Sequence, residues 1–209
     1  MKVLVIAPHP DDECLGCGGT ICRHADRGDR VEAAFLTSGE LGLKQLPREE
    51  AWKIREGEAR RAAKILGISA LHFLRCSDWL LGDEIERAAL ALVPLLQEWK
   101  PDLIYLPHPL EWHPDHKASL PVVRAALSRC RNPAPELRTY EVWTPLSEYC
   151  HVEDVTGVMS RKLKALRAHP SQLKEFNYTT AIRALNEYRG ALAGKCKYAE
   201  VFSSASAHC

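Results

Sequence analysis

The stretch that decides the fold is KVLVIAPHPDDE, residues 2–13. Its first half is an uninterrupted apolar run, which is typical of a strand buried on both faces of a parallel sheet. Its second half places imidazole and carboxylate groups beside prolines, which stiffen the backbone. A second cluster of this kind, HPDH at 113–116, also follows an apolar run. Nitrogen and oxygen ligands on stiff loops at strand ends suit an open zinc site, so we predict a catalytic metal site built from both loops.

Strand and helix patterns alternate along the chain. After the run at 2–7, further strands are predicted at 30–37, 70–74, 102–106 and 138–143. Helices are predicted at 13–26, 49–66, 84–100 and 116–127, followed by mostly helical structure over 158–192 with a break at His169-Pro170. Strands separated by helices form right-handed βαβ units. We therefore expect one α/β, Rossmann-like domain over residues 1–209, with helices on both faces of a mostly parallel sheet.

The order of the strands decides whether the two clusters meet. In a Rossmann-like order 3-2-1-4-5, the first and fourth strands are neighbours at the point where the winding reverses. Ligands bind at the carboxyl ends of those strands. Both clusters follow these two strands in the chain. The expected active site therefore lies at the C-terminal ends of strands 1 and 4.

Composition narrows the range of partners. The chain has 209 residues, 46% of them hydrophobic and 26% charged, with a net charge of +1. This composition is that of an ordinary globular protein and predicts no general attraction to nucleic acid or to anionic membranes. No apolar run approaches the roughly 18 residues of a membrane helix, and the first run is too short for a secretory signal. We expect a cytoplasmic protein, and a homo-oligomer is compatible with the sequence.

Eight cysteines include a CxxC pair, Cys14 and Cys17. No second CxxC completes a set of four sulfur ligands, and disulfide frameworks are uncommon in cytosolic chains of this length. We interpret all eight cysteines, including Cys209, as small buried hydrophobic side chains. A redox pair or a thiolate metal site is the alternative.

Spacing within the first cluster indicates separate roles for its members. His9 and Asp12 lie three residues apart on a tight turn and can bend toward one ion, and His116 can supply a third ligand. Three protein ligands leave a fourth position for water, which zinc makes acidic enough to act as a nucleophile near neutral pH. Asp11 can accept the proton of that water as a general base.

The second cluster can act from the other side of a substrate. His113 precedes His116 by one helical turn and, when protonated, can stabilise an oxyanion or give a proton to a leaving amine. Asp115 can hold His113 oriented and charged. A structural interpretation stays open for both clusters, because acidic residues favour helix N-termini and HPDH can be a solvated loop. For Glu13 we favour this helix-opening role over a ligand role.

The motifs resemble those of a known family. HPDDE at 9–13, followed by GCGGT at 16–20, is similar to the signature of the LmbE-like, or PIG-L, zinc-dependent N-acetylglucosaminyl deacetylases. HPDH at 113–116 resembles the second motif of that family. Shorter similarities continue along the chain at 37–40, 55–56, 168–172 and 198–200. The resemblance thus covers nearly the whole chain and implies a single LmbE-like deacetylase domain over 1–209.

Carried over by position, the resemblance implies that His9, Asp12 and His116 bind zinc, with ferrous iron as the alternative metal. It makes Asp11 the catalytic acid–base. It gives His113, paired with Asp115, the oxyanion or leaving-group role.

Three further residues are candidate substrate contacts. Arg55 resembles a substrate-reaching arginine of the family, with an ordinary surface charge as the alternative. Glu40 follows the second strand beside the expected crevice and has either a binding role or a turn role. Trp112 can stack on a sugar face or serve as a hydrophobic anchor. Glu111 stands where some relatives carry an aromatic hydroxyl.

The leading hypothesis is a metal-dependent hydrolase of carbohydrate metabolism. It removes an acetyl group from the amide nitrogen of an N-acetylglucosamine-type sugar or conjugate, with water on zinc attacking the carbonyl and Asp11 accepting the proton. One alternative is an amidase of the same family that cleaves a different amide conjugate. Another is a non-catalytic metabolite-binding module, although the turn at 8–12 lacks the glycine fingerprint of a dinucleotide site. The expected partner is a small molecule, not nucleic acid or membrane.

Overall fold

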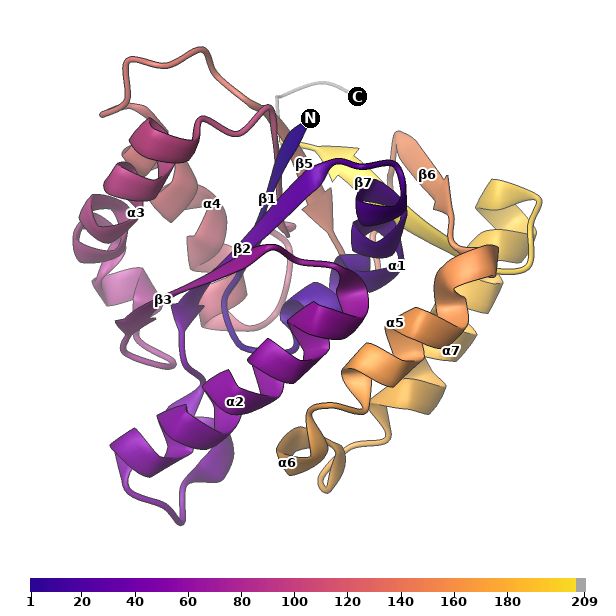
Figure 1. Ribbon diagram of the computed structural model, residues 1–209, viewed down its shortest axis with the longest axis horizontal. Coiled ribbons are helices and arrows are strands. Elements are labelled where there is room, and N and C mark those ends of the chain that lie inside the picture. The colour runs from indigo at the N-terminus through magenta and orange to yellow at the C-terminus, as the bar shows by residue number, and fades with distance from the viewer. Residues whose placement is uncertain (206–209) are drawn as a thin grey trace.

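A single seven-stranded sheet organises the computed structural model, which describes residues 1–205 (Figure 1). The strand order is β3-β2-β1-β4-β5-β7-β6, so the expected order of the first five strands is confirmed. These five strands run parallel, and β7 pairs antiparallel with both β5 and β6. The strands are β1 (Lys2–Ala7), β2 (Arg30–Thr37), β3 (Ala70–Cys76), β4 (Leu103–Pro107), β5 (Glu136–Tyr140), β6 (His151–Asp154) and β7 (Ala199–Ser204).

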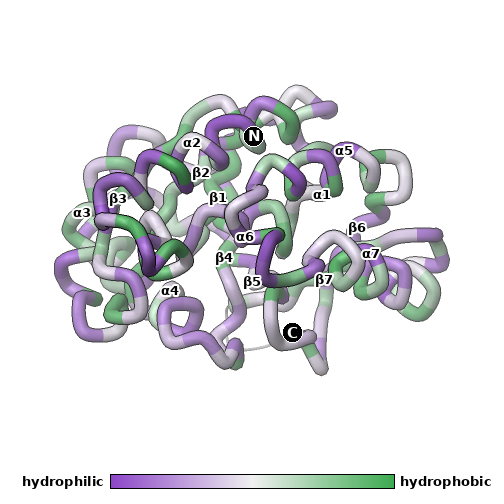
Figure 2. Tube along the Cα trace, turned by 90° about the horizontal axis from the view of Figure 1, so that it is seen from below, coloured by the Kyte–Doolittle hydropathy of each residue, from purple (hydrophilic) through white to green (hydrophobic). Residues whose placement is uncertain are grey.

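Helices cover both faces of this sheet, as predicted. They are α1 (Asp12–Asp26), α2 (Arg48–Leu66), α3 (Ile85–Trp99), α4 (Pro114–Leu127), α5 (Met159–Leu166), α6 (Pro170–Leu173) and α7 (Tyr178–Arg189). Figures 1 and 2 place α3 and α4 on one side of the strands and α1 and α5 on the other. The outer helices alternate between hydrophilic and hydrophobic segments in Figure 2, as expected for helices with one buried face. Within residues 1–205, none of the helices has the length and apolar composition needed to cross a membrane.

The first strand lies at the centre of the core. Val3, Val5 and Ala7 pack into the cluster formed with α1 and α2, whereas Leu4 and Ile6 pack into the cluster formed with α3 and α4. All five side chains are fully buried. This two-sided burial explains why the strand is a continuous apolar run.

Some predicted boundaries are wrong, and the reasons are local. The fifth strand ends at Tyr140 rather than at residue 143, because the backbone amides of Val142 and Trp143 donate to the carboxylate of Glu111 instead of to a strand. Helix α4 begins at Pro114 because His113 caps it. Strands β6 and β7 were not predicted; β6 is only four residues long and alternates between exposed and half-buried residues.

Close packing fixes α1 against the sheet. A Cβ on Gly16 would lie 2.1 Å from Cδ2 of Tyr140. Tyr140 is fully buried, and its hydroxyl donates to the carbonyl of Ile6 at 2.8 Å. The turn between β1 and α1 is thereby held at the C-terminal edge of the sheet.

Gly16→Ala is expected to lower the free energy of unfolding by about 1–3 kcal/mol, because the added methyl group must displace Tyr140 or the helix. Urea unfolding measures the effect. Gly157→Ala is the matched control, since a Cβ there meets no atom within 4 Å. Equal unfolding midpoints for the two variants would contradict the close packing of α1.

Candidate active site

The turn between β1 and α1 has an unusual backbone. Asp11 has φ 134° and ψ −24°, a region that residues other than glycine rarely adopt. Its amide donates to Oε2 of Glu13 at 3.0 Å, and its carbonyl accepts from the amides of Cys14 and Leu15. Arg55 donates from α2 to the carbonyl of Pro10 at 2.6 Å. Buried groups from two elements therefore fix this turn and the directions of its side chains.

His9, Asp12 and His116 meet where β1 and β4 end. Oδ2 of Asp12 lies 3.2 Å from Nδ1 of His9 and 3.2 Å from Nε2 of His116. Ligand atoms of His9, His113 and His116 also lie within 4.8 Å of one another. His116 is fully buried, and among the described residues neither of its ring nitrogens has a hydrogen-bond partner. A buried imidazole nitrogen that faces a carboxylate without a hydrogen bond fits a metal ion held between them.

Two carboxylates contact the opposite side of the His9 ring. Nε2 of His9 lies 3.1 Å from Oδ1 of Asp78 and 3.1 Å from Oδ2 of Asp115. Burial lowers the pKa of His9, but the carboxylates of Asp115, Asp12 and Asp78 raise it well above its usual value. Such carboxylates orient a metal-binding imidazole and increase its basicity.

Asp78 was not predicted as a site residue. It follows β3, which lies two strands from β1 in the sheet and ends at the same edge, and this position was the available sequence signal.

The expected pairing of the Asp115 carboxylate with His113 is wrong. That carboxylate binds His9 and accepts from the amides of Trp79, at 2.8 Å, and Leu81, at 3.1 Å. His113 instead caps α4, where its Nδ1 accepts from the backbone amide of Asp115 at 3.2 Å. An accepting nitrogen carries no proton, so this contact assigns the proton of the neutral ring to Nε2. Burial and the nearby His9 and His116 lower the pKa of His113 to about 4. The prediction of a protonated His113 is therefore corrected: the ring is neutral and can donate one hydrogen bond.

The two adjacent carboxylates of the first motif have different electrostatic surroundings. Burial raises the pKa of Asp11 to about 6, although Arg55, whose Nη2 lies 3.5 Å from Oδ1, opposes the rise. Burial also acts on Asp12, but His116 and His9 hold the pKa of that carboxyl well below its usual range. A carboxyl group with a raised pKa suits proton transfer, and one with a lowered pKa suits a metal ligand.

Glu111 lies behind His116 and outside the cavity. It is fully buried, and Oε2 is 3.7 Å from Nδ1 of His116. Its oxygens accept from the amides of Val142, Trp143 and Thr144. This acidic residue therefore holds the loop after β5 in place.

A cavity of about 420 Å³ opens above these groups. His9, Asp11, Asp12 and His113 are among its lining residues. One side is an aromatic wall in which successive ring centroids lie 6.3, 6.1 and 6.2 Å apart, formed by Trp79, Trp112, Trp143 and Phe176. Trp112 is 54% exposed, which is unusual for so large an apolar side chain and consistent with ligand contact. Of this wall only Trp112 was predicted.

Arg55 and Glu40, both predicted substrate contacts, occupy different positions. Arg55 lines the cavity, but it is buried and donates to the carbonyls of Gly39 and Pro10. Glu40 lies outside the cavity: it accepts from Nε1 of Trp52 at 3.0 Å and pairs with Arg48 at 3.0 Å. These contacts favour the turn role for Glu40, which was its alternative interpretation.

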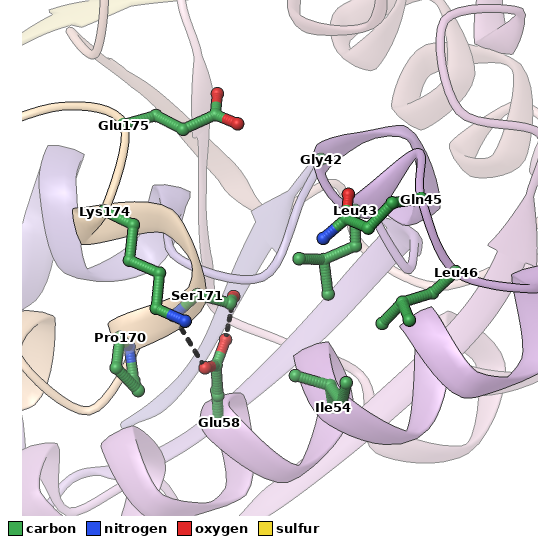
Figure 3. Close-up of a pocket in the computed structure, with 10 residues that line it drawn as sticks. All are labelled: Gly42, Leu43, Gln45, Leu46, Ile54, Glu58, Pro170, Ser171, Lys174 and Glu175. Carbon is green, nitrogen blue, oxygen red and sulfur yellow. Dashed lines mark hydrogen bonds between the residues drawn. The ribbon is translucent and has the colours of Figure 1, made fainter.

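A second pocket of about 310 Å³, called the side pocket, opens next to the cavity and shares Gly42 and Glu175 with it (Figure 3). The carboxylate of Glu58 accepts from the amide and the hydroxyl of Ser171 at 3.0 and 2.6 Å. The remaining lining residues are Leu43, Gln45, Leu46, Ile54, Pro170 and Lys174. The wall of the side pocket therefore combines aliphatic side chains with polar and charged ones.

Comparisons with known proteins agree with this geometry. The family model described as "PIG-L: GlcNAc-PI de-N-acetylase" matches residues 4–127. The diacetylchitobiose deacetylase of Thermococcus kodakarensis is 31% identical, covering 95% of this chain and 81% of that protein. A probable N-acetyl-alpha-D-glucosaminyl L-malate deacetylase 2 of Bacillus cereus is 32% identical, covering 88% and 90%.

Two solved structures are similar over most of their length. The conserved protein TT1542 of Thermus thermophilus superposes with a TM-score of 0.86 at 30% identity, covering 99% of this chain and 95% of that one. The N,N'-diacetylchitobiose deacetylase of Pyrococcus horikoshii superposes with a TM-score of 0.84 at 27% identity, covering 97% and 83%.

His116→Ala and His9→Ala are each expected to lose bound divalent metal on dialysis, because each removes one of the three predicted ligands. Elemental analysis of the dialysed proteins measures the metal content. His72→Ala removes a partly exposed histidine that pairs with Glu32 and should keep its metal. Stoichiometric metal in both ligand variants would show that the ligand set is wrong.

Proposed function

Because the chain belongs to the PIG-L family of de-N-acetylases, we propose that it removes the acetyl group from the amide nitrogen of an N-acetylglucosamine-type sugar or conjugate. We also propose that residues 1–209 form one domain of this family. The observation that carries the proposal is the buried Nε2 of His116, which has no hydrogen-bond partner within residues 1–205 and lies 3.2 Å from Oδ2 of Asp12, while Asp11 lines the cavity beside Asp12. The products are acetate and a free amino sugar.

His9, Asp12 and His116 would hold the metal ion, for which we propose zinc, with ferrous iron as the alternative. When bound, such an ion polarises a carbonyl oxygen and lowers the pKa of a water molecule. The fit rests on the donor set: two imidazole nitrogens and one carboxylate oxygen converge, and carboxylates support His9 from behind.

Asp11 and His113 would carry out the proton transfers and stabilise charge. Asp11 accepts a proton from the attacking water while the water oxygen bonds to the acetyl carbon. His113 donates from Nε2 to the carbonyl oxygen as negative charge develops there. The carbon–nitrogen bond then breaks, and Asp11 returns its proton to the leaving nitrogen. Arg55, which lies 3.5 Å from Asp11, favours the ionised form that the first step needs.

The cavity wall supports a sugar substrate. Aromatic faces pack against the apolar CH face of a pyranose ring, and the aromatic wall presents such faces beside His113. The lining also offers polar groups for sugar hydroxyls, namely Lys44, Gln172 and Glu175. This combination of aromatic and polar lining residues suits a pyranose ring, which is apolar on its face and carries polar hydroxyls at its edge.

The side pocket would receive the group attached to the acetylated sugar. Gly42 lines both spaces and packs closely against two residues that line the cavity, since a Cβ on Gly42 would lie 2.6 Å from Nη1 of Arg55 and 2.8 Å from Oε1 of Gln172. Glu58 and Glu175 outnumber Lys174 in the side pocket, so its charge favours an uncharged group over an anionic one. A second sugar ring therefore fits better than a carboxylate- or phosphate-bearing group.

Asp11→Asn is expected to keep its metal but to lose about 10²–10⁴-fold in kcat, because it removes a base and spares the ligands. Acetate release from N-acetylglucosamine and its conjugates, with and without chelator, gives the measurement. Activity within a few-fold of wild type would contradict the base assignment. If metal-loaded wild type releases no acetate from any of these sugars, the amidase alternative is favoured; if it holds no stoichiometric metal, the binding-module alternative is favoured.

Ile54→Trp should fill the side pocket and raise KM for N,N'-diacetylchitobiose by about tenfold, which corresponds to about 1.4 kcal/mol. The monosaccharide N-acetylglucosamine is the internal control, since it does not reach the side pocket, and its kinetics should not change. Equal effects on both substrates, or no effect on either, would contradict this placement.

A further inference from the structure

A second group of ionisable side chains lies beneath the active-site turn. It consists of Glu13, Cys14 and His169, and each is at most 1% exposed. The Cys14 thiol donates to Oε1 of Glu13 at 3.3 Å, and Nε2 of His169 lies 3.7 Å from the same oxygen. The other oxygen of Glu13 accepts from the backbone amide of Asp11 at 3.0 Å. One face of the Glu13 carboxylate is therefore occupied by the core, and the other holds the turn.

The turn needs such a contact because its backbone is strained. The positive φ of Asp11 costs free energy for a residue with a Cβ, and the surrounding structure must supply compensating contacts. Within residues 1–205, the side chain that accepts from the Asp11 amide is Glu13. Without this acceptor a buried amide is left unsatisfied, and the backbone is free to relax toward an ordinary conformation.

We infer that Glu13 is a positioning residue for Asp11: through the backbone amide it holds the strained conformation that aims the Asp11 carboxylate into the cavity. This inference rests on the proposed role of Asp11 as the base. His169, from the break between α5 and α6, supports Glu13 from a distant part of the chain. Glu13 itself does not line the cavity and does not touch a substrate there.

The variants are Glu13→Ala, which removes the acceptor, and Glu13→Gln, which keeps a carbonyl oxygen able to accept from the Asp11 amide. Displacing a catalytic group by about 1 Å can cost about 10²-fold in rate. We therefore expect Glu13→Ala to lose about 10- to 100-fold in kcat, with little change in KM and full metal content. Glu13→Gln should recover most of kcat.

The decisive measurement is a double-mutant cycle with Asp11→Asn. If Glu13 acts only through Asp11, Glu13→Ala should have almost no further effect on kcat in the Asp11→Asn background. Glu141→Ala is the matched control. Glu141 is also buried and accepts a hydrogen bond from the backbone amide of Leu146 at 2.7 Å, but it does not contact Asp11. It should lower Tm without lowering kcat.

Several outcomes would overturn the inference. These are an equal loss of kcat in both backgrounds, wild-type kcat in Glu13→Ala, or no recovery in a folded Glu13→Gln variant. The three clustered side chains could also hold a metal ion, so a second metal equivalent in wild type that is lost in Glu13→Ala would make Glu13 a ligand instead. Wild-type activity of Asp11→Asn alone would instead contradict the proposed role of Asp11 as the base, so the two failures are distinguishable.

Discussion

The conformation of one turn, residues 8–12, is the constraint on which the site depends. It follows a strand that is buried on both faces and precedes a helix packed closely against Tyr140, so neither end of the turn can move. Between these fixed ends, Asp11 adopts a positive φ that sends adjacent carboxylates in different directions. Arg55 from α2 and Glu13 from α1 hold the backbone on either side. Three separate segments, namely α1, α2 and the break between α5 and α6, thus converge on the backbone of this turn.

The positions of the acidic side chains relative to the histidines determine the electrostatics of the site. Four buried carboxylates, Asp11, Asp12, Asp78 and Asp115, surround imidazole rings. Unpaired, these charges would be too costly to bury. Contact with two histidines lowers the pKa of Asp12. Burial raises the pKa of Asp11 to about 6. Two chemically identical neighbours therefore acquire different chemical characters from their surroundings, as the proposed roles of Asp12 as a ligand and Asp11 as a base require.

The proposed substrate contacts come mostly from segments outside the two motifs. The aromatic wall combines the loop after β3, the loop before α4, the loop after β5 and the segment before α7. The side pocket lies between the turn at Glu40–Leu43, α2 and α6. The floor of the cavity is buried and hydrogen-bonded, whereas its rim is built from loops whose side chains are partly exposed. Such a division lets the chemistry stay the same while the accepted conjugate differs from one family member to another.

The sequence by itself determined the α/β architecture, the order of the first five strands and the meeting of His9, Asp12 and His116. It could do so because two-sided burial leaves a continuous apolar run, and the winding reversal then brings the ends of β1 and β4 together. Only the tertiary structure decided the partners of individual side chains. Asp115 lies two residues after His113 in the chain but contacts His9, and Asp78 and Trp143 reach the site from the loops after β3 and β5, where the sequence pattern does not identify the partner of a side chain. The physical reason is that periodicity records which face of an element is buried, whereas hydrogen-bond partners depend on how loops distant in sequence pack across the sheet edge.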